Sequence, residues 1–341
     1  MGKRIGIDLG TTYSVVAIVG DYGGREQHFG RVSVLTDSYR RMLHASAICE
    51  CEGEIIYGED AKYKAAEGYA PIRFWKRYMG KGITFPLKGK ECLPQDMSRE
   101  LLVYLKQVAE KAVGDRVDSA IITHPAYFGG DAIAATREAG DQAGLKVGED
   151  GLMMEPIAAA LAYLQDDPNP ENTIRVMVYD LGGGTFDLTV LERSNGVFRP
   201  LSFGGDPELG GYNFDKELAA HLLKHLRRQG YKIAIDPDKP ERDARWATLM
   251  QIAEDIKINQ FGKDPPAVKA DLRMTRIFKD DDGKSVQLAL TVTRDEFEAM
   301  IRPMIDHTIK CCGDTLAKAK VDFKAIDRAI LVGGSSRLPL V

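Results

Sequence analysis

The chain has 341 residues, of which 44% are hydrophobic and 28% are charged, and its formal net charge at pH 7 is −4. This composition is typical of a soluble globular protein, and the length predicts two domains or one large two-lobed unit. The slightly negative charge argues against nucleic acid or an anionic membrane as the main partner, because such partners require clustered lysine and arginine. The five cysteines form neither a C-x-x-C pair nor a zinc-finger spacing. We therefore expect no structural zinc site and a reducing compartment.

The N-terminal stretch predicts a hairpin with an unusual turn. Residues 5–19 read IGIDLGTTYSVVAIV: a strand, Asp-Leu-Gly, a Gly/Thr turn and a second strand. The first strand begins so close to the N-terminus that no room is left for a signal peptide, and no apolar run approaches membrane-spanning length. We therefore expect a cytoplasmic protein.

The same pattern occurs a second time near the middle of the chain. Residues 176–191 read VMVYDLGGGTFDLTVL, again a strand, Asp-Leu-Gly, a turn of Gly and Thr, and a strand. Three consecutive glycines weaken a strand interior and offer no side chain to pack. We therefore expect these glycines to have a role other than packing. Two copies about half a chain apart predict two related α/β lobes.

The remaining pattern predicts helices and strands around these hairpins. Ser98 is the expected N-cap of a helix that runs to about Val113, and Glu155 followed by Pro156 is expected to start another helix. Thr293 and Glu296 form a capping-box pattern. The other expected elements are a buried strand at 120–123, helices at 131–143, 213–229 and 240–261, a tight turn at 280–283 and a last strand at 329–332.

The polar segment 166–170 is the predicted boundary between the lobes. Lobe I is expected at 1–167, with a core of 1–36 and 99–167 and an inserted subdomain at 37–98. Lobe II is expected at 168–341, with a core of 168–204 and 285–341 and an inserted subdomain at 205–284. A lobe that ends just after its last strand would lack the helices that cover it, so we expect a truncated C-terminus.

The two turns carry residues that suit phosphate binding. Glycine lets consecutive backbone N–H groups form an anion-binding concavity, and Thr11, Thr12 and Thr185 add hydroxyl donors. Asp8 and Asp180 would repel a phosphate by about 4 kcal/mol per charge pair at ~4 Å and an effective dielectric constant of ~20. A divalent cation removes this conflict, because Mg²⁺ keeps waters that carboxylates hold while phosphates ligate the metal. Two facing hairpins therefore predict a clamp for a Mg²⁺-polyphosphate.

Other interpretations of the glycine-rich segments have less support. Both hairpins could be ordinary turns, but two matching copies favour the clamp. Gly283-Lys284-Ser285 ends like a P-loop, yet Phe278 replaces the first glycine, and the same turn lacks the first and twelfth ligands of an EF-hand. No G-x-G-x-x-G follows a strand, which leaves dinucleotide binding without support.

Six motifs occur in a fixed order: IDLGTTYS at 7–14, PAYF at 125–128, Glu155-Pro156, DLGGGTFD at 180–187, LGG at 209–211 and VGGS at 332–335. Together they resemble the DnaK-type heat-shock chaperones, the seventy-kilodalton class, over essentially the whole chain. The similarity is to the ATPase half of those proteins. It implies an α/β, actin-like ATPase fold with two lobes, each a mixed β-sheet flanked by helices, and a nucleotide cleft between them.

The resemblance also implies a role for each residue around the phosphates of ATP or ADP. Asp8 and Asp180 would hold waters of a Mg²⁺ ion, with Glu155 close by, and K⁺ is a second candidate cation. Lys76 would be the catalytic lysine that positions the attacking water, although from the residues alone it is an ordinary surface lysine. Asp187 would lie near that water and the terminal phosphate. The phosphates would be bound by Gly10, Thr11, Thr12, Tyr13, Gly182, Gly183, Gly184 and Thr185.

On the adenosine side the resemblance is less complete. Glu254 and Lys257 would contact the ribose and base, although their i, i+3 spacing also fits a surface ion pair. Phe261 stands where the family usually has a serine that lines the base, and Tyr212-Asn213 replaces a usually acidic pair. The remaining expected nucleotide contacts are Gly211, Gly333, Gly334, Ser335 and Arg337.

The predicted function is therefore the ATPase domain of a divergent DnaK-type chaperone, in which the nucleotide controls lobe closure. The resemblance implies a J-domain co-chaperone and a nucleotide exchange factor as partners, and client polypeptides bound only through a C-terminal domain. Pro125, the family's switch proline, is present. Gly129-Gly130 and Ile133 replace the Asn-Asp and Arg that couple the ATPase to substrate, which predicts weakened stimulation by peptide.

Two alternatives share the expected fold. The first is a small-molecule, sugar-type kinase, for which Asp187 could be the general base. No sugar-binding cluster accompanies that residue, and PAYF favours the chaperone. The second is an actin-like filament ATPase, but the many charges in residues 37–98 give no sign of an apolar polymer interface.

Overall fold

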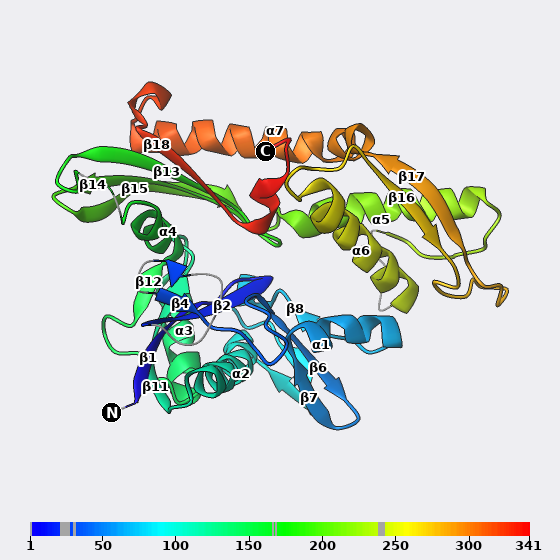
Figure 1. Ribbon diagram of the computed structural model, residues 1–341, viewed down its shortest axis with the longest axis horizontal. Helices are drawn as coiled ribbons and strands as arrows, with labels where there is room; N and C mark the ends of the chain where they lie inside the picture. The colour runs from blue at the N-terminus through cyan, green and yellow to red at the C-terminus, as the bar shows by residue number, and fades with distance from the viewer. Residues whose placement is uncertain (1, 21–27, 30–31, 166, 168, 238–242) are drawn as a thin grey trace.

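A computed structural model describes residues 2–20, 28–29, 32–165, 167, 169–237 and 243–341. The chain forms two α/β lobes, one above the other in Figure 1, so the two-lobed α/β prediction is confirmed. Lobe I holds the elements from β1 to β12, and lobe II holds those from β13 to the C-terminal turn. Asp166 and Pro168 of the predicted boundary lie outside the described residues, and the proposed division into cores and inserted subdomains stays a prediction.

Lobe I is built on a seven-stranded sheet in the order β12-β11-β1-β2-β4-β3, with β5 paired to β2. The first hairpin, β1–β2, is antiparallel, whereas β1 pairs with β11 and β11 with β12 in parallel. Alternate residues of β1 and β2 are buried, as in a strand pair that packs one face on a core. The strands of lobe I are β1 (Lys3–Asp8), β2 (Tyr13–Val19), β3 (His28–Phe29), β4 (Val32–Val34), β5 (His44–Ala45), β6 (Ala47–Cys51), β7 (Glu54–Tyr57), β8 (Ile72–Arg73), β9 (Phe85–Leu87), β10 (Lys90–Cys92), β11 (Val117–His124) and β12 (Leu152–Met154).

Lobe II repeats this arrangement on a smaller sheet in the order β15-β14-β13-β18. The hairpin β13–β14 is antiparallel and β13 pairs in parallel with β18, as β1–β2 and β11 do in lobe I. The internal repeat seen in the sequence is therefore a structural repeat. The strands of lobe II are β13 (Ile174–Leu181), β14 (Phe186–Ser194), β15 (Val197–Asp206), β16 (Lys269–Met274), β17 (Leu288–Thr293) and β18 (Arg328–Val332), of which β16 and β17 pair only with each other.

The predicted helices at 131–143 and 213–229 are present within two residues of their expected ends, whereas two other N-termini differ and the short helix at Gly58–Tyr63 was not predicted. Helix α2 begins at Pro94 with Leu93 as its N-cap, so the prediction that Ser98 is the N-cap is wrong. Ser98 is fully buried and its hydroxyl accepts a hydrogen bond from Trp75 Nε1 at 3.1 Å. Helix α6 begins after the N-cap Asp243; residues 240–242 of the expected helix lie outside the described part. The helices are α1 (Gly58–Tyr63), α2 (Pro94–Val113), α3 (Gly130–Gln142), α4 (Glu155–Tyr163), α5 (Gly211–Arg228), α6 (Ala244–Ile256) and α7 (Arg294–Ala319).

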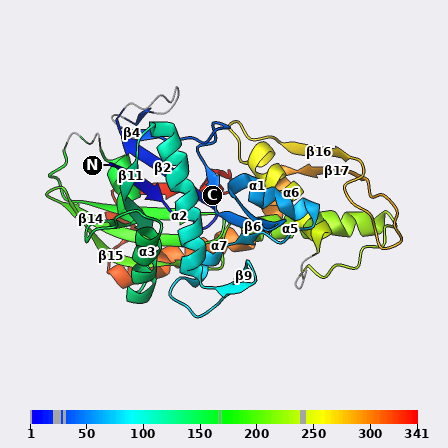
Figure 2. The same ribbon diagram turned by 90° about the horizontal axis from the view of Figure 1, so that it is seen from below.

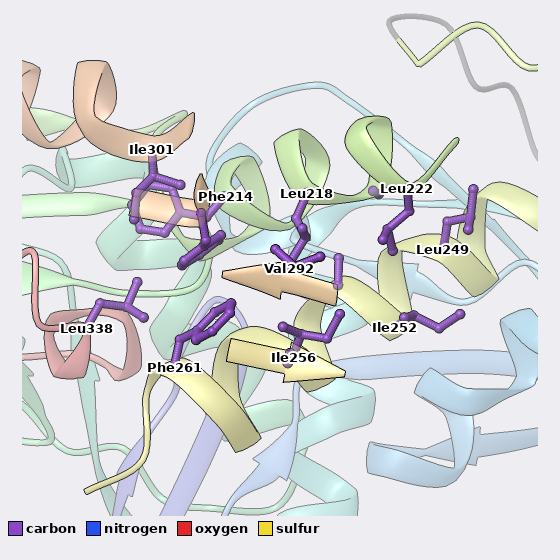
Figure 3. Close-up of a cluster of buried hydrophobic side chains, with 14 of the residues drawn as sticks. Phe214, Leu218, Leu222, Leu249, Ile252, Ile256, Phe261, Val292, Ile301 and Leu338 are labelled. Carbon is purple, nitrogen blue, oxygen red and sulfur yellow. The ribbon is translucent and has the colours of Figure 1, made fainter. Parts of the chain in front are cut away.

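Each lobe has its own apolar core. In lobe I, α2 and α3 cover one face of the large sheet, as Figure 2 shows. In lobe II the leucine stripe of α5 packs against α6, α7 and the β16–β17 pair, which Figure 3 shows in close-up. The stripe consists of Leu218, Leu222, Leu223 and Leu226, all buried, which confirms the helical pattern read from the sequence. None of the described helices is long and apolar enough to span a bilayer.

Helix α4 connects the two lobes. It begins at Glu155 directly after β12 of lobe I, with Pro156 in the first turn as predicted. Its other face packs on the lobe II sheet, where Ala160 is buried in a cluster with Val176 and Ile330. The first residue of this helix is therefore held at lobe I while its body lies on lobe II, which fixes where the two sheets meet.

Candidate functional site

The carboxyl ends of three parallel strands bring acidic and hydroxyl groups together in lobe I. Asp8 ends β1, Thr123 lies near the end of β11, and Glu155 follows β12. Thr123 Oγ1 donates to Asp8 Oδ1 at 2.7 Å. This edge of an α/β sheet is the usual place for a ligand, because strand ends and helix starts open there together.

Lys76 is buried beside these groups and is not a surface lysine. It lies in the 3₁₀ turn Trp75–Tyr78 and is 5% exposed. Its Nζ donates to the carbonyl of Leu9 and to Glu155 Oε1, the latter at 2.5 Å. Burial raises the pKa of Glu155, and the charge of Lys76 opposes that shift. The ammonium group of Lys76 therefore connects the first hairpin, through Leu9, to the first residue of α4.

The second hairpin adds two carboxylates that face each other. Asp180 of β13 and Asp187 of β14 are partners in the antiparallel register, so their side chains leave the same face of the hairpin. Burial and then the charge of Glu155 raise the pKa of Asp180 well above its usual range, and the charges of Asp187 and Asp8 add to the effect. Burial and Glu155 likewise raise the pKa of Asp187 to about 7. Carboxylates from both lobes thus share one poorly hydrated space, which favours the binding of a cation.

The carbonyl groups of the glycine turn between these two carboxylates accept hydrogen bonds. Gly182 O accepts from Gly211 N at 3.0 Å and from Ser335 Oγ at 2.9 Å, and Gly183 O accepts from Tyr212 N at 2.7 Å. Gly184 O accepts from the guanidinium of Arg77. The amide groups of Gly183 and Gly184, by contrast, have no acceptor within the described residues. A turn with bound carbonyls and free N–H groups is suited to an anion.

The two turns meet at the centre of the cleft. A methyl group added at Gly183 would lie 2.5 Å from Thr12 Oγ1 and 2.9 Å from Thr12 Cβ, so only glycine fits there. One added at Gly184 would lie 2.9 Å from Thr11 Cγ2. Thr12 Oγ1 is itself a buried polar atom without a hydrogen-bond partner in the described part of the chain. Since a buried hydroxyl is rarely left unsatisfied, this atom indicates a ligand between the hairpins.

Glu254 and Lys257 are buried and form separate ion pairs, so the alternative of a surface i, i+3 pair is wrong. Lys62 Nζ of α1 lies 2.9 Å from Glu254 Oε1 and donates to Tyr13 Oη, also at 2.9 Å. Burial would raise the pKa of Glu254, but the charges of Lys62 and Arg73 outweigh it and the pKa is lowered. The Lys62–Glu254 pair therefore joins the two lobes at the far end of the cleft from Asp187.

Lys257 is held on lobe II, in a π-helical turn (Lys257–Phe261) that continues α6. Its Nζ lies 2.6 Å from Asp215 Oδ2 and donates to Gly211 O at 3.0 Å. Burial raises the pKa of Asp215 to about 6, although Lys257 opposes the shift. Phe261, at the end of the same turn, is fully buried and its ring stacks on Phe297, so this side chain belongs to the core and does not line the cleft.

The last expected contacts lie in the turn after β18. Gly333 adopts φ +85°, in the left-handed region that favours glycine, and the 3₁₀ turn Gly334–Arg337 follows it. Ser335 is buried and its hydroxyl donates a hydrogen bond to Gly182 O, whereas Arg337 is exposed. The turn after β18 is thereby tied to the glycine turn of the second hairpin, while no side-chain hydrogen bond or ion pair of Arg337 is found among the described residues.

A cavity of about 790 Å³ opens beside this meeting point. Thr12 and Gly183 line it at one end, and Lys62, Glu254 and Lys257 line it further along. It is large enough for a small organic ligand with several charged groups. Within the described residues, no three or more His, Cys, Asp or Glu side chains are arranged to hold a metal directly.

Several residues of the site carry no signal in the sequence. Thr123, Lys62 and Asp215 each pair with a predicted residue, but they lie far from it in the chain. Arg77, next to Lys76 in the sequence, donates to the glycine turn of the opposite lobe, and no local motif marks it for that role. The Lys62–Glu254 and Arg77–Gly184 contacts depend on how the two lobes face each other, and the other two pairs depend on the folding of a single lobe.

Two similar α/β lobes with paired Asp-Leu-Gly hairpins at their interface define the actin-like ATPase class of folds. The chain belongs to the Hsp70 family: the family model described as "Hsp70 protein" matches residues 71–341. The predicted family and fold class are thus confirmed.

Proteins named "Chaperone protein DnaK" are similar to this chain over its whole length. That of Mycoplasma mobile is 36% identical over 339 residues, which cover 99% of this chain and 53% of that protein. That of Mycoplasmopsis synoviae is 37% identical over 343 residues, or 100% of this chain and 54% of that protein. The protein of Mycoplasmopsis agalactiae is 34% identical over 337 residues. The chain therefore spans about half the length of the curated relatives it matches.

Proposed function

We propose that this chain binds ATP with Mg²⁺ between its two hairpins and hydrolyses it to ADP and phosphate. The free amides of Gly183 and Gly184 and the hydroxyls of Thr11, Thr12 and Thr185 would bind the phosphates. Asp8 and Asp180 would hold waters of the Mg²⁺ ion, which supplies positive charge between carboxylates and phosphates when bound. The single observation that carries the proposal is the buried Thr12 hydroxyl, which lies against the glycine turn of the second hairpin and has no hydrogen-bond partner among the described residues.

Hydrolysis requires mainly positioning and charge stabilisation. Lys76 places a buried ammonium group at this end of the site, and its link to Glu155 fixes the direction of that group. We assign it to the attacking water and the charge that develops on the terminal phosphate. Asp187, which faces Asp180 across the hairpin, would orient the same water. Thr185, hydrogen-bonded to Asp187, would hold the Asp187 carboxylate in place.

The adenosine moiety would occupy the cavity beyond the phosphates. Glu254 and Lys257 line it from lobe II and would contact the ribose and the base. Tyr13, Gly211 and the turn Gly333–Arg337 would complete the contacts. Lys62 already neutralises the charge of Glu254 through the Oε1 atom. The second oxygen of the Glu254 carboxylate and the Tyr13 hydroxyl would therefore hydrogen-bond a neutral sugar.

Calorimetric titration tests this function. We expect ADP and ATP to bind tightly with Mg²⁺ and at least ~10-fold more weakly with excess EDTA, because unscreened carboxylates then face the phosphates. Titration with AMP is the control, since AMP lacks the phosphates that the glycine turn would bind. Equal affinities with and without Mg²⁺ would contradict the proposed role of Asp8 and Asp180.

The role of the whole protein is a wider proposal. The similar DnaK proteins are named as chaperones, and we infer that this chain is the ATPase part of such a chaperone in the cytoplasm. A J-domain co-chaperone, a nucleotide exchange factor and client polypeptides would then be its partners. Stimulation of ATP turnover by an added J-domain protein, measured on a full-length form, tests this role.

A further inference from the structure

Two aromatic rings that are not among the proposed nucleotide contacts meet across the cleft, beside the proposed nucleotide site. Phe74 precedes the turn of lobe I that holds Lys76, and Tyr212 lies in the first turn of α5 in lobe II. Their ring centroids are 5.1 Å apart with an interplanar angle of 63°, an edge-to-face pair. Both side chains line the 790 Å³ cavity beside Thr12 and Gly183. The contact therefore spans the opening between the lobes.

Phe74 is held in an unusual backbone conformation. Its φ of +61° and ψ of 15° place it in the left-handed region, which bulky residues rarely adopt. Two guanidinium groups cover its ring: the Cζ atoms of Arg73 and Arg77 lie 4.8 Å and 5.2 Å from the centroid. Such strain persists only where the surroundings impose it, and it is concentrated at functional and switching sites.

The same group of residues is tied to the phosphate-binding turn. The backbone N–H of Tyr212 donates to Gly183 O at 2.7 Å, and Arg77 donates to Gly184 O. The lobes cannot move apart at Gly183 and Thr12 without separating the two rings. A polyphosphate enclosed between these turns needs that movement in order to leave.

We propose that Phe74 and Tyr212 form an aromatic latch that holds the lobes closed and slows the release of nucleotide. The inference rests on the proposed nucleotide site, because the latch acts on whatever occupies it. It differs in its physical nature from the polar contacts between the lobes, such as the buried Lys62–Glu254 ion pair. Salt screens charges but has little effect on two packed rings, so the contribution of the latch should not depend on ionic strength.

Release of a fluorescent ADP, N-methylanthraniloyl-ADP, displaced by excess ADP in a stopped-flow instrument measures the latch. We expect Phe74→Leu and Tyr212→Leu each to accelerate release by about 2- to 12-fold, the range of an aromatic pair. The double variant should release no faster than the faster single variant, because both changes remove one contact. Tyr212→Phe keeps the ring and should release at the wild-type rate. The acceleration in Phe74→Leu should be the same at ~50 mM and ~0.5 M NaCl.

Three results would overturn the latch: unchanged release in both leucine variants, accelerations that multiply in the double variant, or Tyr212→Phe behaving like Tyr212→Leu. Phe74→Gly covers the case in which Phe74→Leu fails to fold, because glycine adopts the left-handed conformation freely and still removes the ring. If the wild-type chain does not bind the fluorescent ADP, the proposed nucleotide site fails. If it binds and the variants release at the wild-type rate, the latch alone fails.

Discussion

The ammonium group of Lys76 lies 2.5 Å from the carboxylate of Glu155, although 79 positions separate the two residues in the chain. The lysine belongs to a short turn of lobe I and the glutamate to the first residue of α4, the helix that lies on the lobe II sheet. The pair therefore places a fixed positive charge where the lobes meet. Its neighbours are the carboxylates of both hairpins, so this charge is central to what the cleft can bind and stabilise.

Replacing Lys76 by alanine is expected to abolish hydrolysis while nucleotide binding remains. Loss of a preorganised charge at a developing anion typically costs about 100- to 1,000-fold in rate. The phosphate contacts of the glycine turn do not involve this side chain, so the dissociation constant for ADP should change little. Single-turnover hydrolysis and calorimetry measure the two quantities separately. Lys81→Ala, at an exposed lysine five residues later, is the control, and turnover at the wild-type rate in Lys76→Ala would refute the assignment.

Substitution of Gly183 by alanine tests the contact between the two hairpins. The added methyl would lie 2.5 Å from Thr12 Oγ1, closer than real contacts allow, and would push the turns apart. We expect ADP affinity to fall by at least ~10-fold, because the amide groups of the turn would no longer converge on the phosphates. Gly129→Ala serves as the matched variant, since a methyl there meets no atom within 4 Å. Affinity retained in Gly183→Ala would mean that the turn does not approach the ligand closely.

Asp215 should make stability depend on pH. Its pKa is raised by burial to about 6 in the folded chain, against a usual value near 3.8, so between these values the folded state binds more protons than the unfolded state. The stability that this group contributes is therefore present at low pH and is lost as the pH rises from about 4 to about 6, at up to about 1.4 kcal/mol per pH unit.

The Asp215→Asn variant isolates this contribution, because asparagine cannot titrate but can still accept a hydrogen bond from Lys257. Urea unfolding followed by fluorescence at pH 4.5 and pH 6.5 should show a smaller loss of stability in the variant than in the wild type. Parallel pH profiles for the two proteins would show that Asp215 titrates normally.

Phe261→Ser would place a serine where the resemblance to the family suggested one, yet we expect it to damage the fold. Phe261 is fully buried and its ring stacks on Phe297 at 5.2 Å between centroids. Loss of a buried aromatic side chain costs about 3–5 kcal/mol, and a buried hydroxyl adds to that cost. The midpoint of thermal unfolding should fall by several degrees relative to Phe261→Leu. An increase in ADP affinity without loss of stability would instead place this position at the base.

Local pattern was sufficient to predict the two hairpins and most of the long helices, but not the short strands between residues 28 and 92. The alternation in the two hairpins, the leucine stripe of α5 and the Thr293–Glu296 capping box all depend on neighbours in the chain, and the structure has them. Ser98 shows where local pattern failed. A serine at that spacing is a good N-cap, but burial against Trp75 and the earlier start at Pro94 gave it another role. The choice between those roles depends on a tertiary contact.

The two Asp-Leu-Gly hairpins and their chemistry can be predicted from local sequence, because acidic residues, glycines and threonines at fixed spacing have few other uses together. How these groups are paired depends on the folded arrangement of the chain. Lys62 meets Glu254 and Phe74 meets Tyr212 because the two lobes lie against each other, whereas the Lys257–Asp215 pair forms within lobe II. Tertiary packing also buries Lys76. None of these pairings can be predicted from neighbouring residues, because the partners lie far apart in the chain.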